Sequence, residues 1–160
     1  MIPWETIDQT NIPDSKEILT LRKRGNEYSI RTPETELMNS RVFGSEEILA
    51  EAVTGRLAKL AKPQLLIGGL GMGFTLAAAL KTAADDIRIT VSELIPAVVE
   101  WNQKFFGPLA GHPLDDIRVT LNIEDVMATG KRQRNQWDGI ILDVDNGPAG
   151  LTHRENDRLY

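Results

Sequence analysis

The chain has 160 residues, with 18 basic and 23 acidic side chains, a formal net charge of −5 and 41% hydrophobic residues. This length and composition are typical of a soluble globular protein that can bury a core of its own. The sequence contains no cysteine, which excludes thiol catalysis, iron–sulfur clusters and cysteine-based zinc sites. The negative charge makes nucleic acid an unfavourable partner.

The sequence also predicts the cellular location of the protein. The first residues lack the basic and apolar segments of a signal peptide. The longest uncharged stretch, Gln64 to Leu80, contains four glycines and is too short to cross a bilayer. We therefore expect a cytoplasmic protein that does not associate with membranes.

Residues 1–44 are expected to form a small β region. Apolar and polar residues alternate from Leu19 to Arg24 and from Glu27 to Thr32, around the turn pair Gly25-Asn26, which predicts a β-hairpin. A third short strand is expected from Glu36 to Asn39.

Residues 45–160 are expected to form an α/β domain. Ser45 is the predicted N-cap of a helix that ends near Ala61, before Lys62-Pro63. Apolar strands and helices then alternate, which favours a doubly wound, mainly parallel, Rossmann-like sheet. The predicted strands are Leu65–Ile67, Ile87–Val91, Ile117–Leu121 and Gly139–Leu142, and the predicted helices are Phe74–Thr82, Pro96–Phe106 and Glu124–Ala128.

A glycine-rich loop joins the first of these strands to its helix. Gly68 ends the strand, and Gly69, Gly71 and Gly73 follow in a GxGxG pattern. Such a loop lets a ligand approach the backbone closely. A dinucleotide fingerprint would need glycine or alanine at position 74, which is Phe74. The GxGxG pattern instead resembles the loop of S-adenosylmethionine-binding domains, and a tight turn without a ligand is the alternative.

Acidic residues follow the next strands. Glu93, which Leu94 follows, comes after the second predicted strand. Nucleoside-binding folds need a carboxylate at this position to accept hydrogen bonds from ribose hydroxyls. Asp125 follows the third strand, where an adenine amino group would lie. It is equally suited to cap the next helix.

The fourth strand ends in Asp143-Val144-Asp145-Asn146-Gly147. Asp143 and Asp145 face one pocket only if the chain turns there, as Asn146-Gly147 favours. No histidine or further carboxylate is placed nearby to complete a coordination shell, so we expect no metal.

These four strand ends together resemble the spermidine synthase family of polyamine aminopropyltransferases, which has a methyltransferase-type fold. The resemblance covers roughly residues 36–151. It lies in Leu66-Ile67-Gly68-Gly69, Glu93, the segment from Val119 to Asp125, Trp137 to Asp143, and Gly147-Pro148-Ala149.

The resemblance implies an activity and a set of roles. The protein would transfer an aminopropyl group from decarboxylated S-adenosylmethionine to a small amine. Gly68, Gly69, Gly71, Gly73, Glu93, Leu94 and Asp125 would bind the co-substrate, Asp143 would be catalytic, and Asp145 would bind the amine.

Two alternatives remain open. The family's loop carries an aspartate where this chain has Leu70, Gly71 and Met72. The first alternative is therefore a methyltransferase that uses intact S-adenosylmethionine on a small acceptor. The second is a non-catalytic interaction domain. The basic run from Lys131 to Arg134 could bind RNA in that case, but such a run is more often solvated surface.

The number of strands gives one more expectation. A full fold of this type has seven strands, and four are predicted here. We expect either a truncated domain or an open sheet edge that a partner chain covers, as in a homodimer.

Overall fold

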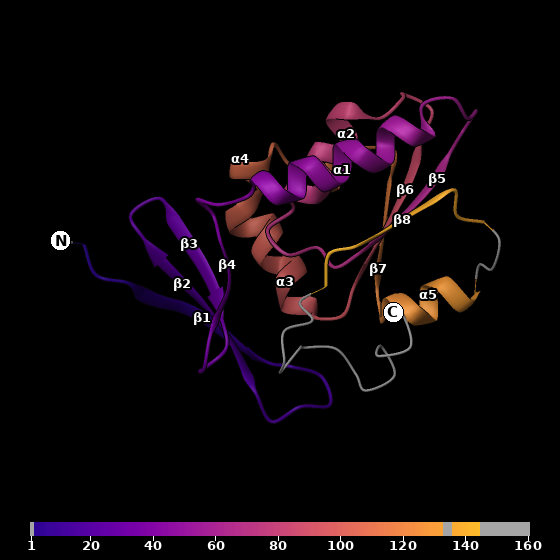
Figure 1. Cartoon of the computed structure of the whole chain (residues 1–160). Coiled ribbons are helices and arrows are strands. Elements are labelled where there is room, and N and C mark those ends of the chain that lie inside the picture. Colours follow the sequence, from indigo (N-terminus) through magenta and orange to yellow (C-terminus); the bar gives the residue numbers. More distant parts are fainter. Residues whose placement is uncertain (1, 133–135, 145–160) are drawn as a thin grey trace. The chain divides into compact units, whose positions relative to one another are not determined.

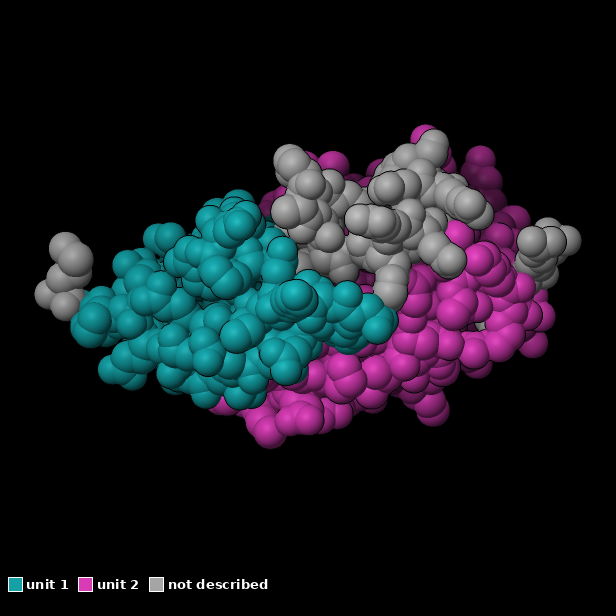
Figure 2. Space-filling model, turned by 90° about the horizontal axis from the view of Figure 1, so that it is seen from below, with its two compact units in different colours: residues 1–43, 145–160 teal, residues 44–144 magenta. Residues whose placement is uncertain are grey.

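The computed structural model describes residues 2–132 and 136–144. They form two compact units, one that ends at Phe43 and one from Gly44 to Val144 (Figure 2). None of the described helices is long and apolar enough to cross a membrane.

The N-terminal unit is a four-stranded antiparallel sheet in the order β1-β2-β3-β4 (Figure 1). Its strands are β1 (Glu5–Asn11), β2 (Ile18–Arg24), β3 (Glu27–Arg31) and β4 (Glu36–Asn39). The predicted hairpin is confirmed, because Arg24 pairs with Glu27 across the turn. Leu19, Leu21 and Ile30 are buried on one face of this sheet. Strand β1 was not predicted, because its sequence is almost entirely polar.

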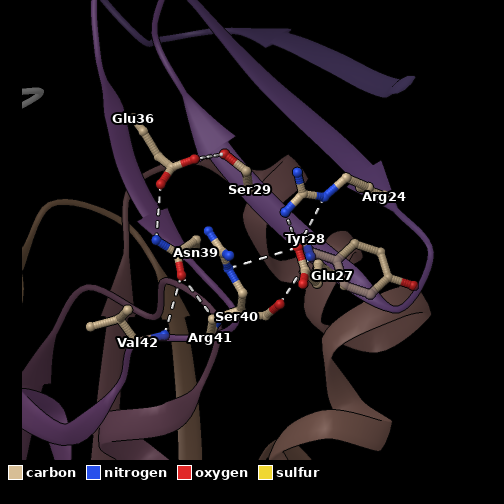
Figure 3. Close-up of polar contacts among 9 residues, drawn as sticks. All are labelled: Arg24, Glu27, Tyr28, Ser29, Glu36, Asn39, Ser40, Arg41 and Val42. Carbon is tan, nitrogen blue, oxygen red and sulfur yellow. Dashed lines mark hydrogen bonds and ion pairs between the residues drawn. The ribbon is translucent and has the colours of Figure 1, made fainter. Parts of the chain in front are cut away.

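The other face of this sheet carries a network of polar contacts (Figure 3). Glu36 accepts hydrogen bonds from Ser29 Oγ at 2.6 Å and from Asn39 Nδ2 at 2.9 Å. Arg24 forms an ion pair with Glu27 at 2.6 Å. The Ser29–Glu36 and Arg24–Glu27 contacts join neighbouring strands, and the bond from Ser29 lowers the pKa of Glu36.

The second unit is built on a parallel sheet in the order β7-β6-β5-β8. Its strands are β5 (Gln64–Gly68), β6 (Arg88–Glu93), β7 (Val119–Ile123) and β8 (Gly139–Leu142). The predicted α/β class with a small N-terminal sheet is confirmed. Because the strand order reverses between β5 and β8, the carboxyl ends of these two strands mark the point where ligands bind in such folds.

Helices cover this sheet on both faces (Figure 1). On one face α1 packs against α2 and β8. On the other, α5 packs against β5 and β6. The helical segments are α1 (Gly44–Leu57), α2 (Phe74–Thr82), α3 (Pro96–Trp101), a π-helix (Asn102–Phe106), α4 (Gly107–Ala110), a 3₁₀ turn (Pro113–Asp115) and α5 (Val126–Arg132).

The predicted bounds of helix α1 are wrong at both ends. The helix begins at Gly44, and the hydroxyl of Ser45 donates to the Glu46 carboxylate at 2.7 Å. It ends at Leu57, where a tight turn brings Leu60 N to Leu57 O at 2.9 Å. Leu60 is 45% exposed, so no burial supports a further helical turn.

Other elements also differ by a few residues. Strand β6 runs from Arg88 to Glu93 instead of from Ile87 to Val91, and helix α5 runs from Val126 to Arg132 instead of from Glu124 to Ala128. Strand β7 begins at Val119, two residues later than predicted, because Val119 pairs with Ile89 while Ile117 is exposed. The predicted helix after Pro96 is divided, since its second part is the π-helix.

Candidate functional site

The glycine-rich loop lies at the carboxyl end of β5. Gly69, Gly71 and Gly73 have φ angles of 89°, 52° and 84°, which side-chain-bearing residues rarely adopt. A Cβ on Gly69 would overlap the carbonyl oxygen of Asp143. Glycine is therefore required here so that the loop can pass directly beside the end of β8.

Three contacts anchor this loop. Gly69 N donates to Ser92 O at 2.8 Å, and Leu70 N donates to Glu93 Oε2 at 2.8 Å. Asn102 Nδ2 donates to Gly71 O at 2.7 Å. Strand β6 and the π-helix thus hold the loop from two sides.

Glu93 lies at the end of β6 with its carboxylate buried. The residue is 6% exposed, and its second oxygen accepts a hydrogen bond from Ile95 N at 2.8 Å. Burial raises the pKa of Glu93, and the backbone N–H donors oppose this effect. The backbone N–H groups of Gly71 and Leu94 also act on this carboxylate and lower its pKa, so the predicted role in binding ribose hydroxyls requires that they share its acceptor positions with backbone donors. That role stays a prediction.

Asp143 follows β8 on the opposite side of the loop. Its N–H donates to Gly68 O at 2.8 Å, and its Oδ2 accepts a hydrogen bond from Thr75 Oγ1 at 2.6 Å. Burial raises the pKa of Asp143, the Thr75 hydroxyl lowers it, and the charge of Glu46 raises it. Among the described residues, nothing donates to Oδ1.

Asp125 has the capping role that was predicted as the alternative to adenine binding. Its Oδ1 accepts from Met127 N at 2.6 Å, and its carbonyl accepts from Ala128 N at 3.0 Å. It therefore caps helix α5. Contact with an adenine stays a prediction, and this bond leaves Oδ2 for it.

The remaining predicted site residues lie at the edge of the described part of the chain or beyond it. Leu94 is described and is half-buried, between buried Glu93 and Ile95. Asp145 and the Gly147-Pro148-Ala149 segment lie outside the described residues. Within residues 2–132 and 136–144, no cluster of three acidic or histidine side chains could hold a metal ion.

The structure adds two polar residues to this region that were not predicted. Thr75 and Asn102 are both nearly inaccessible, at 2% and 3% exposure, and both direct polar atoms at the strand ends. Their partners lie 68 and 31 residues away in the sequence. No local pattern signals such contacts.

Comparison of the sequence with family models and with curated proteins finds no match. The fold, however, matches solved structures. Spermidine synthase from Thermotoga maritima superposes with a TM-score of 0.69 at 20% identity, over 86% of this chain and 46% of that one. The chain has a spermidine synthase-like fold.

A second spermidine synthase structure, in complex with the transition state analogue AdoDATO, gives the same TM-score of 0.69 and 20% identity, over 86% of this chain and 47% of that chain. The resemblance predicted from the strand ends is thus confirmed for the fold. The chain spans about half the length of these spermidine synthases.

Proposed function

We propose that the protein is a transferase that uses a nucleoside sulfonium co-substrate and transfers an aminopropyl group to a small amine. One observation carries this proposal: buried Glu93 and half-buried Asp143 lie at the ends of two strands on either side of a glycine loop, at the point where the strand order reverses. The spermidine synthase-like fold supports the same conclusion.

The residues at the strand ends suit a nucleoside. Glu93 offers acceptors for a ribose diol, and the loop from Gly69 to Gly73 presents backbone in place of bulky side chains. The spermidine synthase that binds the transition state analogue AdoDATO supports such a ligand by analogy of fold.

Asp143 has the chemistry that an amine acceptor requires. An alkylamine is protonated at neutral pH, and removing its proton costs roughly 4 kcal/mol at pH 7. In the proposed reaction, Asp143 holds the ammonium group, accepts its proton on Oδ1 and aims the nitrogen lone pair. When bound, the co-substrate supplies a sulfonium carbon to which that nitrogen bonds, while the C–S bond breaks and the thioether leaves with its electron pair.

The raised pKa of Asp143 suits this role. A carboxylate that binds a proton more tightly than usual is a better base, as long as it is ionised at the working pH. Burial is the main cause of the shift.

The experiment that tests the function is a transfer assay. The protein is incubated with decarboxylated or intact S-adenosylmethionine and a panel of amines, and the nucleoside products are identified by mass spectrometry. We expect methylthioadenosine that depends on the amine and disappears in Asp143→Asn. Asp115→Asn is a matched control, because that aspartate side chain is 81% exposed, and it should retain activity.

Two outcomes would contradict the proposal. Formation of S-adenosylhomocysteine would instead show methyl transfer. Failure of both nucleosides to bind at millimolar concentration to the folded protein would exclude either reaction. In the same binding assay, Glu93→Ala should weaken nucleoside affinity by about 1–3 kcal/mol, and unchanged affinity would remove Glu93 from the site.

A further inference from the structure

Thr75 differs from Thr54 and Thr82, two other threonines in the helices of this unit. Thr54 and Thr82 donate their hydroxyl groups to the backbone carbonyls four residues earlier, each at 2.9 Å. Thr75 lies in the first turn of α2, where the glycine loop precedes it and offers no such helical carbonyl. Its hydroxyl donates to the carboxylate of Asp143.

The geometry of this contact is that of a strong hydrogen bond. The O–H···O distance is 2.6 Å, within the range of bonds to an ionised acceptor. Thr75 is 2% exposed, so water does not compete for its hydroxyl. A β-branched side chain in a helix also has few rotamers, which fixes the direction of the donor.

The backbone of Asp143 is held independently of its side chain. Its N–H is bonded to Gly68 O, and its carbonyl lies against Gly69. The backbone therefore places the Cα atom, and the hydrogen bond from Thr75 to Oδ2 sets the orientation of the carboxylate. Oδ1 is left without a donor in the described part of the chain.

From this arrangement we propose that Thr75 is the positioning residue of Asp143: it occupies Oδ2 and thereby directs Oδ1 toward the acceptor amine. The inference rests on the proposed function and extends it by one residue. It separates two tasks, since Thr75 orients the base and Asp143 accepts the proton.

The groups around Asp143 determine how its pKa changes when the hydrogen bond from Thr75 is lost. Helix α1 contributes the negative charge of Glu46, and β5 contributes Gly68 and Gly69, which have no ionisable side chain. Burial and Glu46 both raise the pKa of Asp143, and Thr75 opposes them. Removal of the hydroxyl should raise this pKa further.

The test compares Thr75→Val, which removes the hydroxyl at nearly constant volume, with Thr75→Ser, which keeps it. The first readout is the pKa of Asp143, followed by ¹³C NMR of its carboxyl carbon, with Asp143→Asn used to assign the signal. We expect a higher pKa in T75V and a nearly normal one in T75S. This readout requires no turnover, so it stands even if the proposed transfer reaction fails.

The second readout is kinetic. We expect kcat of T75V to fall by about 10- to 100-fold, the equivalent of losing a hydrogen bond to a charged group, with KM for the nucleoside nearly unchanged. The acid limb of the pH–rate profile should move to higher pH. T75S should restore both properties.

Thr54→Val is the matched control, because Thr54 is also a buried helical threonine, at 1% exposure, and its hydroxyl bonds lie within α1 and to Thr82. It should change thermal stability but neither the pKa nor kcat. An unchanged Asp143 pKa in folded T75V would overturn the inference. So would a T75S variant as impaired as T75V, because the methyl group would then be the essential part.

Discussion

At the scale of single residues, the site contains two carboxylates with different partners, buried Glu93 and half-buried Asp143. Glu93 is bonded to backbone N–H groups of its own loop and of the glycine loop. Asp143 has one side-chain donor, Thr75. Burial raises the pKa of both acids, because desolvation penalises the ionised form. Glu93 offsets that penalty with more hydrogen bonds than Asp143 does.

This difference predicts how stability responds to Asp143→Asn. Because the folded pKa of Asp143 is raised, the wild type loses stability as pH rises from about 4, the unfolded value, through the folded pKa. Asparagine retains an acceptor for Thr75 and never ionises. We expect the melting temperature of D143N relative to wild type to increase between pH 4 and pH 7.

The measurement is thermal unfolding across that pH range, with Asp115→Asn as the exposed control. A difference between D143N and wild type that is independent of pH would contradict the prediction. An increase with pH would show that ionisation of this carboxylate destabilises the folded protein.

At the scale of elements, the glycine loop and the helical run after β6 form one assembly. The run passes from α3 through the π-helix into α4. Asn102 opens the π-helix and donates both to Val98 O at 2.9 Å and to Gly71 O at 2.7 Å. π-Helical turns are often found at functional sites, and here the irregular turn carries the side chain that holds the loop.

Two glycines in this unit predict opposite effects of the same substitution. Gly73 has a φ of 84°, and a Cβ there would lie 2.8 Å from Asn102 Oδ1. Gly73→Ala should therefore destabilise the protein by about 1–3 kcal/mol. Gly55 lies inside α1, and a Cβ there would meet no atom within 4 Å, so Gly55→Ala should stabilise the protein by about 0.5–1 kcal/mol.

Urea unfolding of the two variants measures both free energies. Effects of the same sign would contradict the loop geometry. Nucleoside binding should be weakened in Gly73→Ala and unchanged in Gly55→Ala, since only the first residue belongs to the loop.

At the scale of the whole molecule, ionised groups link distant segments of the chain. Arg118 forms an ion pair with Asp116 at 2.8 Å and also donates to Leu80 O at 3.2 Å, which connects the start of β7 to helix α2. The hydrogen bonds from Arg118 lower the pKa of Asp116 to about 2. Glu36 and Glu124 also have lowered pKa values, through Ser29 and Arg132 respectively.

These lowered values predict loss of stability in acid. The contribution of Asp116 is fully present above its unfolded pKa, near 4, and is lost as pH falls toward about 2. Asp116→Asn should lower the melting temperature at pH 6. It should also reduce the slope of melting temperature against pH between pH 4 and pH 2. Wild-type and D116N curves of equal slope would contradict this assignment.

Much of the fold could be predicted because its signals are local. The bounds of α2 and β8 were predicted correctly, since an apolar run between turn residues determines each of them. The hairpin followed from alternation around Gly25-Asn26. Strand β1 could not be predicted, because it has little apolar pattern and forms through hydrogen bonds to β2.

The sequence by itself determined the alternation of strands and helices after Pro63, the glycine loop and the acids at the strand ends, because each depends on neighbours in the chain. Only the tertiary structure decided how these parts meet. It ended α1 at Leu57, assigned Asp125 to the cap of α5, and brought Thr75 to Asp143 across 68 residues. Such contacts depend on the packing of β5 beside β8, and no sequence period records that packing.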